Sequence, residues 1–379
     1  MVTETYPPEV NGVARTIARM ADGLRACGHE IRLIRPRQSR ADRALRTDGF
    51  EETLIPGVPI PRYPQLRIGL PAPGVLERAW RTHRPDVVHI ATEGPLGASA
   101  LAAARRLDIP VATDFHTNFH AYSSHYGMGW TRRLVEAYLR RFHNRAACTM
   151  VPTEELAGEL AALGFQRLLV VGRGVDHFTF SPARRSAELR RSWGAADDVP
   201  VALCVSRFAP EKNFSLVIEA FRAIRAVRPE ARLVLVGDGP LRQSLERAGI
   251  GCVLAGRKLN GELAAHYASA DIFLFPSLTE TYGNVTLEAM ASGLAIVAYD
   301  YAAARQHLKD GVSALLAPRG DEREFIARAQ RLATDLERVR TLGRAARRVA
   351  ESLGWERAIA DFEHALRRTA GRPACHAAA

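Results

Sequence analysis

Two basic residues lie on one short loop in the C-terminal half of the chain, directly after an apolar run. Arg207 and Lys212 are five residues apart on the segment 206–213, which leads into a predicted helix. Two fixed cations beside a helix N-terminus suit a diphosphate, because they neutralise charge that grows as a phosphate leaves. A solvated basic pair is the alternative, since the chain has 52 Lys and Arg residues.

A second loop, residues 277–283, follows another apolar run and precedes a predicted helix that starts near Asn284. A helix N-terminus offers unpaired N–H groups and a partial positive charge. Glu280 lies on this loop, and Glu288 lies about one turn inside the helix. Because carboxylates accept paired hydroxyl hydrogen bonds, one suits a sugar and the other a ribose. The alternatives are a helix-dipole role for Glu280 and an exposed position for Glu288.

The N-terminal half contains two further candidates. Gly12 precedes a predicted helix, where a glycine lets backbone N–H groups approach an anion, although a plain turn and N-cap explain it equally well. His116 follows the predicted strand 111–113 and is expected to face a cleft. His116, His120 and His125 are a weak metal candidate, since no nearby carboxylate completes a motif. We therefore expect no metal site.

The elements that must position these loops alternate between strand and helix, which predicts β-α-β units and parallel sheets. Strands are predicted at residues 29–34, 87–90, 111–113, 147–151, 201–205, 232–236, 251–255, 272–275 and 295–298. Helices are predicted at 13–27, 97–107, 130–144 and 215–227, with others starting near residues 241, 261 and 284. The fragment 237–239 lacks the full dinucleotide fingerprint, and a tight strand-to-helix turn explains it.

This pattern predicts an α/β protein with two successive doubly wound sets and a hinge near residues 172–176. We expect an N-terminal domain at 1–175, a C-terminal domain at 176–370 and a disordered tail at 371–379. The last helix is expected to pack back on the N-terminal domain. Only two residues precede the loop 3–11, so the first strand is very short or the start lies further upstream. Ligands of such sheets bind beyond the carboxyl ends of the strands.

Composition narrows the classes of protein. The 379-residue chain is 47% hydrophobic and 25% charged, which is typical of a globular protein. No apolar run reaches the roughly 18 residues of a membrane span, and the polar N-terminus does not read as a signal peptide. Five dispersed cysteines favour reduced thiols in a cytoplasm. The net charge of +11 favours a phosphate-bearing partner without choosing among nucleotide, nucleic acid and anionic lipid.

The predicted helix in segment 130–142 is strongly basic. Leu134, Tyr138 and Phe142 share one face, with arginines around it. Such a helix can lie on anionic lipid, so peripheral contact with the inner face of the cell membrane is one interpretation. An ordinary helix that faces the core and carries a solvated basic side is the other.

Taken together, the candidate residues resemble the donor-site signature of retaining glycosyltransferases of family 4. The resemblance rests on Arg207 with Lys212, and on Glu280 and Glu288 separated by seven residues, and it runs over nearly the whole chain. It implies the GT-B fold, two Rossmann-like domains that face a central cleft. Segments 3–13, 92–97 and 279–298 look most like bacterial GDP-mannose-dependent α-mannosyltransferases.

The resemblance also implies roles for single residues. Arg207 and Lys212 would grip the donor diphosphate, Glu280 would hold hydroxyls of the transferred sugar, and His116 would contact that sugar. Glu288 would bind the ribose. Gly12 would line the phosphate or acceptor side, and the loop with Lys258 would meet the base. Sugar and phosphate would further meet backbone N–H groups of Thr281, Tyr282, Gly283, Asn284 and Val285.

The reaction implied is the retaining transfer of a hexose, with mannose favoured, to a lipid or glycan acceptor. GDP-mannose is the favoured donor, and a UDP-sugar is the other candidate. The nucleotide-sugar is a substrate, so we expect no cofactor, and the basic residues would replace a metal. A sugar-nucleotide epimerase of the same fold remains an alternative. A glycosidase using Glu280 and Glu288 would leave the basic loop without a task. No nucleic-acid-binding motif is present, so no nucleic-acid partner is expected.

Overall fold

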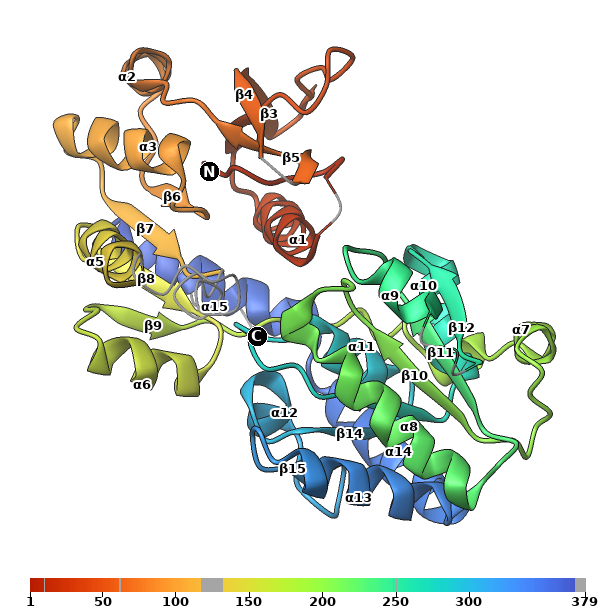
Figure 1. Ribbon diagram of the computed structural model, residues 1–379. Helices are drawn as coiled ribbons and strands as arrows, with labels where there is room; N and C mark the ends of the chain where they lie inside the picture. Colours follow the sequence, from red (N-terminus) through yellow and green to blue (C-terminus); the bar gives the residue numbers. More distant parts are fainter. Residues whose placement is uncertain (10, 61–62, 117–131, 248, 250, 372–379) are drawn as a thin grey trace. The chain divides into compact units, whose positions relative to one another are not determined.

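The computed structural model describes residues 1–9, 11–60, 63–116, 132–247, 249 and 251–371 (Figure 1). The chain divides into two compact units. The first unit combines Met1–Arg173 with Trp355–Ala379, and the second is Gly174–Gly354. The last helix, α15 (Trp355–Thr369), therefore belongs to the first unit.

The main sheet of the first unit contains the parallel strands β6 (Val88–Ile90), β7 (Val111–Asp114), β8 (Cys148–Val151) and β9 (Leu168–Val170), in this order. A parallel pair, β1 (Ile31–Pro36) and β3 (Phe50–Ile55), joins them through Val2, which bridges Ile34 on one side and Ile90 on the other. At the place expected for the first strand, ahead of the loop 3–11, this chain thus has the single bridging residue Val2.

The sequence did not reveal the strands that follow β1. β2 (Arg46–Thr47) pairs antiparallel with β3, and β4 (Gly57–Ile60) forms an antiparallel hairpin with β5 (Tyr63–Gly69). The helices in the described part of this unit are α1 (Gly12–Ala26), α2 (Pro73–Thr82), α3 (Pro95–Arg106), α5 (Arg132–His143), α6 (Glu154–Ala162) and α15. α15 packs against α1, and its Phe362 lies in the same apolar cluster as Ile17 and Met20 of α1.

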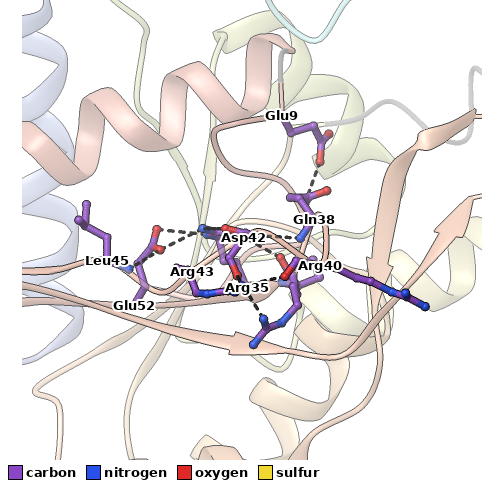
Figure 2. A network of polar contacts seen from close by, with 10 residues as sticks. Glu9, Arg35, Gln38, Arg40, Asp42, Arg43, Leu45 and Glu52 are labelled. Atoms are coloured by element: carbon purple, nitrogen blue, oxygen red, sulfur yellow. Dashed lines mark hydrogen bonds and ion pairs between the residues drawn. The ribbon is translucent and has the colours of Figure 1, made fainter.

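A buried ionic network closes the loop after β1 (Figure 2). The Arg35 side chain is 3% exposed, and its Nη1 lies 2.7 Å from Oδ2 of Asp42. Its Nη2 lies 3.0 Å from Oε2 of Glu52. Asp42 also accepts the backbone N–H of Gln38, and Glu52 accepts that of Leu45. One arginine thus holds the loop between two carboxylates.

The second unit is a six-stranded parallel sheet in the order β12-β11-β10-β13-β14-β15. Its strands are β10 (Val201–Val205), β11 (Arg232–Val236), β12 (Val253–Gly256), β13 (Ile272–Phe275), β14 (Ala295–Tyr299) and β15 (Leu315–Ala317). The predicted bounds of β10, β11 and β13 are confirmed to the residue. The strand order reverses between β10 and β13, so their carboxyl ends form the topological switch point, where such sheets bind ligands.

Helices cover both faces of this sheet, because alternate strand residues point to opposite sides. Val201 and Leu203 pack with α10 (Asn260–Ser269) and α11 (Asn284–Ala291), whereas Ala202 and Cys204 pack with α8 (Phe214–Val227) and α13 (Glu322–Ala333). The remaining helices are η2 (Pro182–Arg184), α7 (Ala187–Ser192), η3 (Pro210–Lys212), α9 (Arg242–Arg247), α12 (Ala302–His307) and α14 (Leu336–Glu351).

Candidate active site

Lys212 and Glu280 meet at the switch point of the second unit. Lys212 ends the short helix η3 after β10, and Glu280 lies on the loop after β13. Lys212 Nζ lies 2.5 Å from Oε1 of Glu280 and 3.4 Å from Oγ of Ser277. The two side chains are 11% and 15% exposed, so this ion pair is largely enclosed. It joins the two loops at the end of the sheet.

Arg207 has its own carboxylate partner, which the sequence analysis missed. Its Nη2 lies 2.5 Å from Oε1 of Glu211, whose side chain is completely buried. The Arg207 side chain as a whole is 41% exposed, so the pair joins a half-exposed arginine to a buried carboxylate. The four-residue spacing of Arg207 and Glu211 was the available signal.

The turn Gly237–Gly239 packs closely against the loop that carries Arg207. A Cβ atom on Gly237 would collide with the carbonyl oxygen of Ser206, and one on Gly239 would lie 2.6 Å from that of Phe208. Phe208 donates its backbone N–H to the carbonyl oxygen of Asp238 at 2.9 Å. The segment is therefore the tight turn that the sequence predicted, and its glycines allow close backbone packing.

Helix α11 begins at Asn284 with Gly283 as its N-cap, in a left-handed conformation with a φ of 94°. Asn284 and Val285 open the helix at the candidate site, after Thr281. The first N–H groups of a helix have no intrahelical partner and favour an anion. Glu288 is buried, and its Oε2 accepts the Tyr267 hydroxyl at 3.0 Å. The alternative of an exposed Glu288 is therefore wrong.

Tyrosines hold the loop that carries Glu280. The Tyr301 hydroxyl donates to the carbonyl oxygen of Glu280 at 2.7 Å. Tyr282 is buried, and its hydroxyl lies 2.9 Å from Nε2 of His307. Burial lowers the pKa of His307 to about 4, so this ring is neutral near pH 7. Lys258 lies on the loop after β12, with its Nζ 3.9 Å from Oε1 of Glu262.

In the first unit, Gly12 opens helix α1 and is exposed. The preceding Asn11 caps the helix, because its side chain accepts the N–H of Ala14 at 2.8 Å. The N-cap interpretation is thus confirmed, and it leaves the anion-binding interpretation of Gly12 a prediction.

His116 follows β7 and is buried between charged groups. Its Nδ1 lies 3.1 Å from Nη2 of Arg173, and its Nε2 lies 3.0 Å from Oδ2 of Asp114. Arginine can only donate, so Nδ1 accepts and the proton of the neutral ring resides on Nε2. Burial lowers the pKa of His116, against the opposing effect of Asp114. The other two histidines of the weak metal candidate, at positions 120 and 125, lie outside the described residues.

Two buried glutamates of this unit were not recognised in the sequence. Glu4 accepts the N–H of Leu96 at 2.9 Å, which caps the start of α3, and it also accepts the N–H of Gly69. Burial raises the pKa of Glu93 to about 8. No sequence spacing connects Glu4 to helix α3, so only the fold could reveal this contact.

Comparisons with known proteins agree with these features. The family profile "Glycosyltransferase Family 4" matches residues 10–177, and "Glycosyl transferases group 1" matches residues 199–335. A GDP-mannose-dependent alpha-mannosyltransferase of Mycolicibacterium smegmatis is 38% identical over 79% of this chain and 79% of its own length. The chain belongs to glycosyltransferase family 4.

Two other proteins resemble this glycosyltransferase over most of its length. A GDP-mannose-dependent alpha-(1-6)-phosphatidylinositol dimannoside mannosyltransferase of Mycobacterium tuberculosis is 30% identical over 95% of this chain and 93% of its own. The structure of sucrose-phosphate synthase from Thermosynechococcus elongatus is 19% identical, with a TM-score of 0.77 over 97% of this chain and 98% of that one. The fold is therefore GT-B, as the sequence predicted, and none of these relatives favours the epimerase alternative.

Proposed function

We propose that this glycosyltransferase moves mannose from GDP-mannose to a lipid or glycan acceptor with retention of the anomeric configuration. The observation that carries the proposal is the ion pair of Lys212 with Glu280 at the switch point, on the loop that leads to the start of α11. Arg207 lies on the same loop as Lys212. The mannosyltransferase relatives support the choice of donor.

In this proposal the chemistry consists of stabilising a departing nucleotide. Arg207, Lys212 and the N–H groups that open α11 neutralise charge on the diphosphate as the sugar bond breaks. Glu280 accepts hydroxyl hydrogen bonds from the sugar, and Glu288 from the ribose. The acceptor oxygen attacks the anomeric carbon on the face that the diphosphate leaves, and its proton passes to a phosphate oxygen.

The remaining assignments follow the family resemblance. We assign His116 to the transferred sugar, which it would meet as a neutral ring. Gly12 lines the phosphate or acceptor side, and Lys258 contacts the base.

The proposed donor is tested by incubating the protein with GDP-mannose, UDP-glucose, UDP-galactose and GDP-glucose, each with a mixture of membrane lipids. Release of nucleotide that depends on acceptor, together with a mannosylated product, is expected with GDP-mannose alone. A product from a UDP-sugar at a higher rate would overturn the choice of donor.

Transfer is expected to survive an excess of EDTA, because the proposal gives the role of a metal at the diphosphate to Arg207 and Lys212. The measurement is the initial rate after chelation, with and without added Mg²⁺ or Mn²⁺. A rate abolished by EDTA and restored by either ion would contradict metal independence.

Tyr267→Phe is expected to raise the KM for the donor about tenfold with little change in kcat. The Tyr267 hydroxyl donates to the Glu288 carboxylate, and a hydrogen bond to a charged group contributes about 1.5 kcal/mol. Because the ribose is bound equally in the ground state and the transition state, the loss affects KM and leaves kcat unchanged. Tyr299→Phe is the matched control, since its buried hydroxyl has no hydrogen-bond partner among the described residues. If the two variants had the same KM for the donor, Tyr267 would have no specific role in donor binding.

We further propose a peripheral contact between helix α5 and an anionic membrane surface on the cytoplasmic side. Leu134 is 66% exposed and Tyr138 44% exposed, with Arg133 and Arg141 exposed beside them. Phe142 is buried, as the alternative of a helix that faces the core predicts for this residue, so the proposed contact rests on Leu134 and Tyr138. No helix in the described part of the chain is both long and apolar enough to cross a membrane.

Replacing Arg133 and Arg141 together by Gln is expected to weaken binding to phosphatidylglycerol-containing vesicles about tenfold to thirtyfold, since each juxtamembrane cation contributes about 1 kcal/mol. Co-sedimentation measures the bound fraction. Arg222→Gln with Arg348→Gln removes the same charge from exposed sites of the second unit and serves as control. An equal loss in both double variants would contradict a specific role of α5.

A further inference from the structure

Both cations assigned to the donor diphosphate are already paired with carboxylates. Lys212 lies 2.5 Å from Glu280, and Arg207 lies 2.5 Å from Glu211. In formal charge, the two cations and the two carboxylates cancel. A diphosphate that binds at this site gains the full attraction of the cations only if a carboxylate moves away from its cation.

The two pairs differ in how easily they can open. Glu211 is completely buried, and a guanidinium has five donors, so Arg207 can keep Glu211 on one edge and bind phosphate with another. Lys212 has one compact ammonium, whose donors already face Glu280 and Ser277. Glu280 lies on a loop and keeps 15% of its side chain exposed. Glu280 is therefore the carboxylate that can move.

We propose that Glu280 is an exchangeable partner of Lys212. Without donor, Glu280 holds the ammonium in place. When the donor binds, Lys212 turns to the diphosphate, and the released Glu280 carboxylate turns to hydroxyls of the sugar. This inference rests on the proposed function, because it assumes a nucleoside diphosphate-sugar at the switch point.

The exchange discriminates between donor and product. An intact donor supplies both the phosphate for Lys212 and the hydroxyls for Glu280, so it satisfies both groups. A nucleoside diphosphate that has lost its sugar satisfies only Lys212, and Glu280 then competes with it for the ammonium. The ion pair therefore weakens product binding and favours release after transfer.

The test compares GDP binding to the full chain and to Glu280→Gln by isothermal titration calorimetry. Gln keeps the size of Glu but loses the charge that competes for Lys212. GDP is expected to bind the variant about fivefold more tightly, because the carboxylate that competes for the ammonium has lost its charge. GDP-mannose is expected to gain less, since the carboxylate no longer holds its hydroxyls. Unchanged or weaker GDP binding would overturn the exchange.

Glu211→Gln is the matched control at the other pair. Since Glu211 anchors Arg207 and does not exchange, this variant is expected to bind GDP no more tightly than the wild-type chain. Equal tightening in both variants would mean that any lost negative charge strengthens GDP binding, and it would overturn the specific role of Glu280. Glu280→Asp, which shortens the side chain by one methylene, is expected to tighten GDP binding by less than Gln and covers the case in which Gln fails to fold.

The exchange and the proposed function can fail separately. If mannosyl transfer is absent but Glu280→Gln still tightens binding of GDP or UDP, the proposed function is wrong and the exchange stands. If transfer from GDP-mannose occurs and neither Glu280 variant tightens GDP binding, the exchange is wrong and the proposed function stands.

Discussion

Lys212→Ala is expected to lower kcat for transfer by about 10² to 10³, equivalent to roughly 3 to 4 kcal/mol of transition-state stabilisation. In the proposed reaction, Lys212 binds the donor diphosphate, whose negative charge grows as its bond to the sugar breaks. An interaction that is stronger in the transition state than in the ground state affects kcat as well as kcat/KM. Steady-state kinetics at saturating donor measure the effect.

The loss of kcat is expected to be specific to the position of the Lys212 ammonium group. Lys212 lies at the junction of the two switch-point loops, 2.5 Å from Glu280, whereas Lys309 is exposed in the same unit. Lys309→Ala is therefore the matched control and is expected to keep the wild-type kcat. Lys212→Arg is expected to recover only part of the activity, because a planar guanidinium does not replace a compact ammonium. If Lys212→Ala kept the wild-type kcat, the assignment of Lys212 to the donor diphosphate would be wrong.

The parallel sheet of the second unit could be predicted from the sequence because its central strands are buried on both faces. Val201–Val205 and Ile272–Phe275 are therefore continuous apolar runs with polar loops at their ends. Parallel strands place those ends at one edge of the sheet. Loop position and residue type together thus predicted that Lys212 and Glu280 lie close together, as their ion pair shows, whereas the place of Arg207 in the same site stays a prediction.

The partners of these residues could not be predicted in the same way. Tyr267 lies on α10, and nothing in its local sequence links it to Glu288, which is 21 residues away on another helix. The contact arises because α10 and α11 pack on the same face of the sheet. Glu4 is similar, since Leu96 at the start of α3 donates to it, and so is Asp114 with its second partner, His89 of β6, at 3.3 Å. Sequence patterns report periodicity and loop position, whereas such contacts depend on tertiary packing.

The first unit was harder to predict where its strands are short and exposed. β2 has two exposed residues, and β4 contains a proline, so neither shows the apolar run or alternation that identifies a strand. The buried network of Arg35 explains how this region is held. An arginine followed by acidic residues at positions 42 and 52 gives no periodic signal, although it fixes the loop after β1 (Figure 2).

Arg35→Met is expected to lower the free energy of unfolding of the first unit by about 3 to 5 kcal/mol, because it leaves two buried carboxylates without a cation. Asp42 and Glu52 are only 7% and 4% exposed, so water cannot replace the guanidinium. The measurement is unfolding in denaturant, monitored by amide hydrogen exchange of β1 and β3. Arg40→Met removes an exposed arginine of the same loop and is expected to change stability by less than about 0.5 kcal/mol.

Two measurements distinguish the loss of charge compensation from the loss of packing in Arg35→Met. Adding Asp42→Asn and Glu52→Gln to Arg35→Met removes the uncompensated charges and is expected to recover part of the stability. The hydrogen bond from Arg35 holds the pKa of Asp42 below its ordinary 3.8, so the stabilisation is complete above that value and is lost as the pH falls below it. The difference between wild type and Arg35→Met should therefore be largest near neutral pH and shrink below about pH 4. A difference that stays constant with pH, with no recovery in the triple variant, would assign the loss to packing and not to charge.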